Sequence, residues 1–147
     1  MRQSEGTALV TDLEQACVAI GDLVHQIRKR VPEVVAEHRQ RLLDRVAKVL
    51  ETHQTRLDDN DVIREVALIA DRSDISEELV RLESHVEQFR SLLHDTAPGR
   101  SLDFLAQELG REANTIGSKS VDVAIAHAVV DLKSQVERIR EQAANIE

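Results

Sequence analysis

The chain has little of what β-strands are usually built from. Among its 147 residues there is no Trp and no Tyr, and there are only two Phe and two Pro. Strands favour aromatic and β-branched residues at alternating positions, and no useful run of that kind occurs. Leu, Ala, Glu, Arg and Gln, which favour helices, dominate instead. The expected fold class is therefore all-α.

Cysteine and long apolar runs are also scarce. Cys17 is the only cysteine, so an internal disulfide is excluded and a reducing compartment is favoured. No apolar run approaches the roughly 20 residues that span a bilayer. The first ten residues, MRQSEGTALV, lack the layout of a signal peptide. These absences predict a cytoplasmic protein with no membrane partner.

The charge balance is acidic, with a formal net charge of −8. A domain built mainly to bind nucleic acid is usually basic, because contacts with phosphates draw on Lys and Arg. An acidic excess instead favours solubility, or supplies carboxylates to a divalent cation. Local clusters of charge matter more than the net charge of the chain. The net charge therefore excludes neither a nucleic-acid-binding protein nor a protein whose carboxylates bind a divalent cation.

Apolar residues recur at spacings of three and four over long stretches, which predicts helices that pack along one another. The first helix is expected to end at about Arg30. A second should begin at Pro32, since proline suits the first turn of a helix. After a polar turn at residues 52–59, a short helix is expected over residues 61–70.

Three further helices are expected in the second half of the chain. Asp74 and Glu77 have the spacing of a capping box at the start of one of them. Ser101 and Ser120 are expected to cap the other two. Five or six helices result, with an arm formed by a helical hairpin over residues 1–60 and a helical domain over residues 61–147.

Two of the apolar seams are unusually long, at residues 75–93 and 125–146. They expose more apolar surface than one slender hairpin can cover. Long antiparallel hairpins with coiled-coil-like seams, joined into a homo-oligomer, are therefore expected.

Residues 99–120, GRSLDFLAQELGREANTIGSKS, differ from the repetitive helical sequence around them. This segment gathers an acid-amide pair, an Arg-Glu-Ala-Asn run and a Gly-Ser-Lys-Ser run. Packing alone does not require so many polar groups in one place, and we interpret the segment as a functional site.

The same segment, together with its neighbours, resembles a known family. In order, EVALIA at residues 65–70, DISEEL at 74–79, Ser84-His85, Phe89 and residues 99–120 resemble the C-terminal half of the YicC-like bacterial proteins. The ending REQAANIE is similar as well, and residues 1–60 match more loosely. The resemblance implies an endoribonuclease that assembles as a hexameric ring around RNA and depends on a divalent metal. Family members also carry an N-terminal domain of comparable size, and this chain begins where that domain would be ending.

Two pairs of side chains are candidates for the chemistry. Glu78 and His85 are seven residues apart, so on a helix they lie on nearly the same line. They can share a metal, or the carboxylate can orient the imidazole as a general base. Alternatively, Glu78 is a solvated charge and His85 covers the edge of the seam.

Glu108 and Glu112 form the second pair, at i and i+4 on one helix face. Either a divalent ion, Mg²⁺ or Mn²⁺, bridges the two carboxylates, or Arg111 neutralises them. With the resemblance, the expected metal ligands are Glu78, Glu108 and Glu112, and the expected catalytic groups are His85, Glu108 and Glu112.

Residues 117–120 are a candidate phosphate site. Exposed amides at the start of a helix, with Lys119 beside them, can hold a phosphate, although a glycine turn with a capping Ser120 explains most of the same residues. With the resemblance, the expected RNA-binding residues are Arg100, Gln107, Arg111, Asn114, Ser118 and Lys119. The other histidines have no partner at metal-ligand spacing and are expected to be ordinary surface or seam residues: His25, His38, His53, His94 and His127.

Two functions from different classes follow. The first is the RNA-cleaving domain of an endoribonuclease that hydrolyses phosphodiesters with the help of a metal. Within it, a second chemistry stays open, in which His85 removes the proton of a ribose 2′-OH and a cyclic phosphate forms. The other function is a noncatalytic helical oligomerisation or scaffold module.

Overall fold

The computed structural model describes residues 2–53, 56, 58–95 and 99–146. Over these residues it contains no strand and five helices, which are α1 (Arg2–His53), α2 (Asp59–Arg72), α3 (Ser76–Leu92), α4 (Gly99–Lys119) and α5 (Val123–Ala143). The prediction of an all-α fold is confirmed. No helix in the described part of the chain combines the length and the apolar character that crossing a membrane requires.

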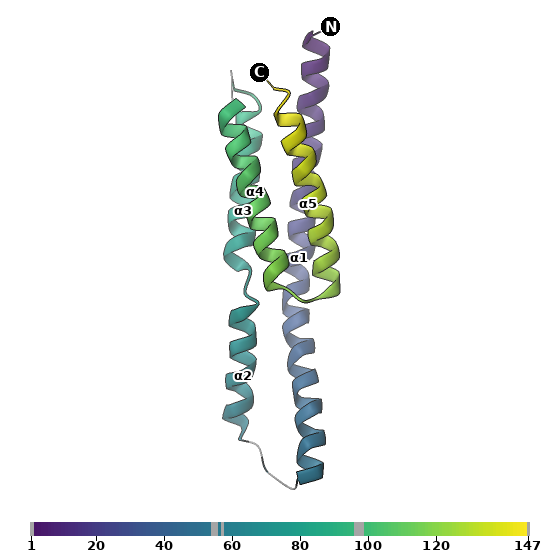
Figure 1. Cartoon of the computed structure of the whole chain (residues 1–147), viewed down its shortest axis with the longest axis vertical. Coiled ribbons are helices and arrows are strands. Elements are labelled where there is room, and N and C mark those ends of the chain that lie inside the picture. The colour runs from purple at the N-terminus through teal and green to yellow at the C-terminus, as the bar shows by residue number, and fades with distance from the viewer. Residues whose placement is uncertain (1, 54–55, 57, 96–98, 147) are drawn as a thin grey trace.

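Helices α3, α4 and α5 form a four-helix bundle with the N-terminal half of α1 (Figure 1). Around the bundle, α1 contacts α3, α3 contacts α4, α4 contacts α5, and α5 returns to α1. Apolar side chains from all four helices fill the centre, and in α1 the last fully buried one is Ile27.

The seams at residues 75–93 and 125–146 lie inside this core. Ile75, Leu82 and Phe89 are buried from the first seam, and Leu132 and Ile139 from the second. Four helices of one chain therefore cover both seams. The reason given above for an oligomer is wrong, because it assumed slender hairpins rather than a closed bundle.

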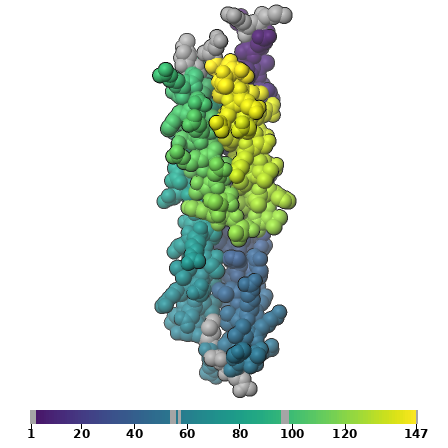
Figure 2. Space-filling model, in the orientation of Figure 1, coloured from purple at the N-terminus to yellow at the C-terminus, as the bar shows by residue number. Residues whose placement is uncertain are grey.

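Helix α1 continues far beyond the bundle and runs beside α2, so that the molecule is elongated (Figures 1 and 2). We call residues 35–53 of α1 together with α2 the distal pair. No residue of α2 is buried. The distal pair thus has a stripe of half-covered apolar side chains instead of a core.

The expected break at Pro32 is wrong, because Pro32 lies inside one continuous helix of 52 residues. A proline removes one backbone hydrogen bond, which long helical sequence on both sides can tolerate. Arg30 adds local support, since its guanidinium pairs with Glu33 at 3.0 Å and with Glu37 at 2.8 Å, on the far side of the proline. The division of the chain into residues 1–60 and 61–147 stays a prediction.

Two expected helix caps are also wrong. Ser101 lies inside α4, and α4 continues through Gly117 to Lys119. Ser120 still donates its backbone N–H to the carbonyl of Ile116, so it closes α4 rather than opening α5. The N-cap of α5 is Asp122, whose carboxylate accepts from the backbone N–H of Ile125 at 3.0 Å.

The start of α3 follows the expectation in part. The Asp74 carboxylate accepts from the backbone N–H of Ser76 at 2.9 Å. Glu77 does not complete a capping box, because the backbone N–H of Asp74 bonds to the carbonyl of Asp71. Glu77 instead pairs with Arg81 at 3.5 Å.

Candidate functional site

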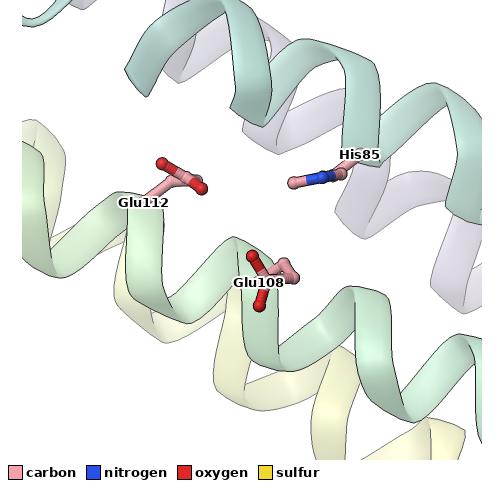
Figure 3. A group of neighbouring side chains, drawn as sticks. All are labelled: His85, Glu108 and Glu112. Atoms are coloured by element: carbon pink, nitrogen blue, oxygen red, sulfur yellow. The ribbon is translucent and has the colours of Figure 1, made fainter. Parts of the chain in front are cut away.

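Facing sides of α3 and α4 bring an imidazole and two carboxylates together. One ligand atom each from His85, Glu108 and Glu112 can be chosen so that all three lie within 4.8 Å of one another. His85 comes from α3 and the two glutamates from α4, and the side chains point into the space between the helices (Figure 3). Glu112 is almost fully buried, with 3% of its surface exposed, whereas His85 and Glu108 are half-buried.

Glu78 extends the cluster towards the end of α4. It is only 4% exposed, and its Oε1 accepts from Lys119 Nζ at 2.8 Å and from Arg81 Nη2 at 3.4 Å. The Arg81 guanidinium also donates from Nε to Glu112 Oε2 at 3.2 Å. Both buried carboxylates therefore contact the same arginine, and the charges alternate from Lys119 through Glu78 and Arg81 to Glu112.

These contacts keep Glu78 charged. Burial by itself works to raise the pKa of this carboxyl, and it is the largest single influence. The hydrogen bond from Lys119, a hydrogen bond from the backbone of Glu78 itself, and the attraction of Lys119 and Arg81 together outweigh burial and leave the pKa of Glu78 below its ordinary value of 4.5. The hydrogen bond to Glu112 is the main cause that raises the pKa of Arg81.

The donor set fits a divalent cation such as Mn²⁺ or Mg²⁺. Such ions prefer carboxylate oxygens and retained waters, and Mn²⁺ also accepts imidazole nitrogen. Two buried polar atoms of the cluster, His85 Nδ1 and Glu78 Oε2, have no hydrogen-bond partner within the described residues. Buried polar atoms are rarely left without a partner, so these two mark a place where a ligand or water is needed.

His85, Glu108 and Glu112 form one group of possible ligands, whereas Glu78, which was expected to be a metal ligand, is not part of that group and is linked to Glu112 through Arg81. The picture of Glu78 as a solvated charge is wrong, since Lys119 and Arg81 hold it in a buried position. Arg111 pairs with Glu108 at 3.7 Å, as expected for the local neutralising partner. The roles of these residues as ligands or catalysts stay predictions.

Sequence reasoning missed Arg81. The signal was present, because Glu78, Arg81 and His85 follow one another at spacings of three and four and so share a helix face. An arginine next to several glutamates on a charged helix usually indicates only surface pairs. The cross-helix contact with Glu112 depends on how α3 lies against α4, which a single sequence does not show.

Most of the expected RNA-binding residues form one exposed stripe on α4. Its members follow at spacings of four, three, four, three and four, and all are exposed: Arg100, Phe104, Gln107, Arg111, Asn114 and Ser118. Because side chains at such spacings share a helix face, the stripe runs along α4 beside the carboxylates. Phe104, with 60% of its surface exposed, was missed by sequence reasoning. It lies in the Leu-Asp-Phe-Leu run but outside the apolar spacing of Leu102, Leu105 and Leu109, and it was given no role.

Lys119 lies elsewhere than expected. Residues 117–119 are the last turn of α4, where backbone carbonyls and not amides are exposed, so the proposed helix-start phosphate site is wrong. Lys119 donates to the carbonyl of Asp74 at 3.3 Å as well as to Glu78. The Ser118 hydroxyl donates to the carbonyl of Thr115 at 3.0 Å. Contact of Ser118 or Lys119 with RNA stays a prediction, but exposed backbone amides at a helix start no longer support it.

A four-helix bundle with a carboxylate–histidine cluster between two adjacent helices defines a helical domain with a candidate metal site. The family model described as "Endoribonuclease YicC-like, C-terminal" matches residues 27–147, and the chain belongs to this family. The match includes α3 and α4, which carry the whole cluster.

Relatives from two bacteria align with the entire chain. A protein of Clostridioides difficile named "Probable endoribonuclease YicC" is 42% identical over 148 residues. A protein of the same name from Haemophilus influenzae is 40% identical over 148 residues. The chain spans about half the length of these relatives, 50% in each case.

Proposed function

We propose that the chain is the RNA-cleaving part of an endoribonuclease, and that the cluster of His85, Glu108 and Glu112 is its catalytic centre. The observation that carries this proposal is that their ligand atoms lie within 4.8 Å of one another. The names of the relatives point to the same substrate and reaction. A cytoplasmic location for this activity is consistent with the free, buried Cys17.

All three residues of the cluster act as metal ligands in this proposal. Glu108 and Glu112 would hold a divalent cation from α4, and His85 would complete the ligand set from α3. Such a cation would supply positive charge beside the scissile phosphate and make a water molecule a better nucleophile. Glu78 lies behind the ligands, and it holds Lys119 and Arg81 in place through their shared carboxylate.

The exposed stripe on α4 supplies the RNA-binding surface. Arg100 and Arg111 can contact phosphates, and the amides of Gln107 and Asn114 can reach ribose or base edges. Phe104 offers a flat apolar face on which a base can stack, which is how aromatic residues commonly bind single-stranded nucleic acid. Because Arg111 also contacts Glu108, a phosphate bound at the stripe lies next to the carboxylates.

Digestion of a labelled single-stranded RNA by the chain, with Mn²⁺ or with EDTA, tests this function. Glu108→Gln should reduce cleavage and Mn²⁺ affinity by more than the roughly 10–100-fold that losses of outer-shell groups cost. RNA binding should persist in Glu108→Gln, since the stripe is unchanged. Phe104→Ala should weaken RNA binding and leave Mn²⁺ affinity as it was.

Two results would contradict the metal route. Cleavage that persists in EDTA and leaves 2′,3′-cyclic phosphate ends would assign the chemistry to His85 as a general base acting on the ribose 2′-OH. Full activity in Glu108→Gln would remove Glu108 from the catalytic centre and with it the proposed ligand set.

We also propose that copies of the chain associate through the distal pair. Between its two helices lies an open groove of 660 Å³, lined mainly by apolar residues: Arg39, Leu43, Asp59, Val62, Ile63, Val66, Ala67 and Ala70. Helix α2 buries no residue against α1, and 65% of the surface of Ile63 is exposed. In a twofold dimer, the apolar side chains of each distal pair can cover the groove of the other copy, so that both grooves are covered by the same surface. The open groove also favours the alternative function, a noncatalytic oligomerisation module. The RNA digestion described above distinguishes this module from an endoribonuclease.

A further inference from the structure

The Arg81 guanidinium places a positive charge beside the carboxylates of the candidate metal site. Its guanidinium contacts three carboxylates from two helices, with Nε donating to Glu112 at 3.2 Å, Nη2 to Glu78 at 3.4 Å and Nη1 to Glu77 at 3.5 Å. Two of these carboxylates are almost fully buried. Without the guanidinium, Glu112 would be a buried charge with no hydrogen-bond partner among the described contacts, which is unfavourable.

Glu112 is the residue that the two roles share. It belongs to the group whose ligand atoms lie within 4.8 Å of one another, and the same carboxylate accepts from Arg81. A doubly charged cation at this group would lie close to the guanidinium, and like charges at such distances repel each other in a partly dry site. Both cations stabilise the same anion, and the site does not need both.

The surroundings allow Arg81 to leave Glu112. Its side chain is 47% exposed, so that water can solvate the guanidinium after a rotation about its flexible stem. Glu77, with a side chain that is 85% exposed, offers a partner on the solvent side of α3. Glu78 does not lose its charge partner, because Lys119 remains bound to it at 2.8 Å.

Resting on the proposed function, we propose that Arg81 is a built-in competitor of the divalent cation. It neutralises Glu112 in the metal-free protein and leaves Glu112 when the cation binds. Once released, the guanidinium stays next to Glu77 at the edge of the site, where it can contact an RNA phosphate. The cation and RNA then favour each other's binding, because each is bound best when Arg81 is away from Glu112.

Titration of Mn²⁺ alone into the chain, followed by calorimetry, tests the competition without RNA. Arg81→Met removes the competitor and should bind Mn²⁺ roughly 10-fold more tightly than the unchanged chain, a coupling of ordinary size between two sites. Arg111→Met is the matched control. It also removes one positive charge from a carboxylate of the cluster, but Arg111 is 74% exposed and, among the described residues, its side chain pairs with Glu108 alone, at 3.7 Å. Its Mn²⁺ affinity should change by no more than about twofold.

The outcomes separate this inference from the proposed metal site. Tighter binding in Arg81→Met than in Arg111→Met supports the competition. Binding that Glu108→Gln abolishes but Arg81→Met leaves unchanged or weakens overturns the competition and keeps the metal site. Absence of Mn²⁺ binding from both the unchanged chain and Arg81→Met overturns both. Circular dichroism checks that the variants fold, and Arg81→Gln replaces Arg81→Met if the latter does not.

Discussion

Among single residues, Glu78 makes the stability of this domain depend on pH. Glu78 has a folded-state pKa below the ordinary 4.5. Its contribution to the free energy of unfolding is therefore fully present at pH values well above 4.5. That contribution is lost as the pH falls through the lowered folded-state pKa, because the protonated carboxyl no longer attracts Lys119 and Arg81.

We predict that Glu78→Gln lowers the free energy of unfolding at pH 7 by about 1–3 kcal/mol, the cost of weakening buried hydrogen bonds between charged groups. The difference from the unchanged chain should shrink as the pH falls through the lowered pKa of Glu78, because below that pKa both proteins carry a neutral side chain at this position. Urea unfolding at pH 7, 5 and 3.5 measures it. Glu137→Gln, which breaks an exposed pair with Arg140 at 3.8 Å, should cost far less at every pH. Equal losses in the two variants at pH 7 would contradict the structural role of Glu78.

Parts of the site were readable from residue spacing and parts were not. The pairs Glu78–His85 and Glu108–Glu112 follow from helix periodicity alone, since residues seven or four apart share a face. That the two faces meet depends on the rotation of α3 against α4 inside the bundle. The partner of Lys119 across 41 residues depends on the same packing, and for this reason Lys119 was assigned to a phosphate instead of to Glu78.

At the scale of the helix, α4 contains two glycines in different surroundings. A Cβ added at Gly110 would meet its nearest neighbour, Val136 Cγ1, at 3.8 Å, which is an ordinary contact. A Cβ added at Gly117 would lie 3.1 Å from Val129 Cγ1. Alanine at Gly110 therefore gains helix propensity without a clash, whereas at Gly117 the valine must move.

We predict that Gly110→Ala raises the free energy of unfolding by about 0.5–1 kcal/mol. Gly117→Ala should raise it by less, or lower it. Thermal unfolding of the two variants beside the unchanged chain measures both effects. A Gly110→Ala variant that is less stable than Gly117→Ala would show that α4 packs differently against α5.

The periodicity of the sequence predicted where most helices lie but not all of their ends. The long seams are visible because each apolar residue recurs on one face. The continuity of α1 through Pro32 was not visible from the sequence. Proline removes one backbone hydrogen bond, and this loss is small compared with the stability of the long helical segments on both sides of it. Ser120 was expected to cap α5, but the N-cap is Asp122, a residue type that also favours this position. Asp122 is favoured by its additional pair with Arg30 of α1, at 3.0 Å, which is the main cause that lowers the pKa of this carboxyl.

At the scale of the whole molecule, the distal pair leaves much of its apolar surface uncovered, since no residue of α2 is buried. We predict that the chain is an oligomer in solution and that Ile63→Asp shifts it towards the monomer, since a charge in the groove opposes association. Val130→Asp is the matched control, because Val130 is 66% exposed but lies on the bundle. Light scattering at micromolar concentration measures the masses. A monodisperse monomer for the unchanged chain would rule out association through the groove.

The unbroken course of α1 has a geometric consequence for such an assembly. With about 1.5 Å of rise per residue, its residues 35–53 span roughly 28 Å between the bundle and the far end of the distal pair. In such an assembly, the number of residues in this stretch would set the distance between neighbouring bundles and between their carboxylate clusters. Removing seven residues from each helix of the distal pair would shorten this stretch by about 10 Å and keep nearly the same face towards the neighbour. Removing only two would turn that face away, so the width of the space between copies can change only in steps of whole helical repeats.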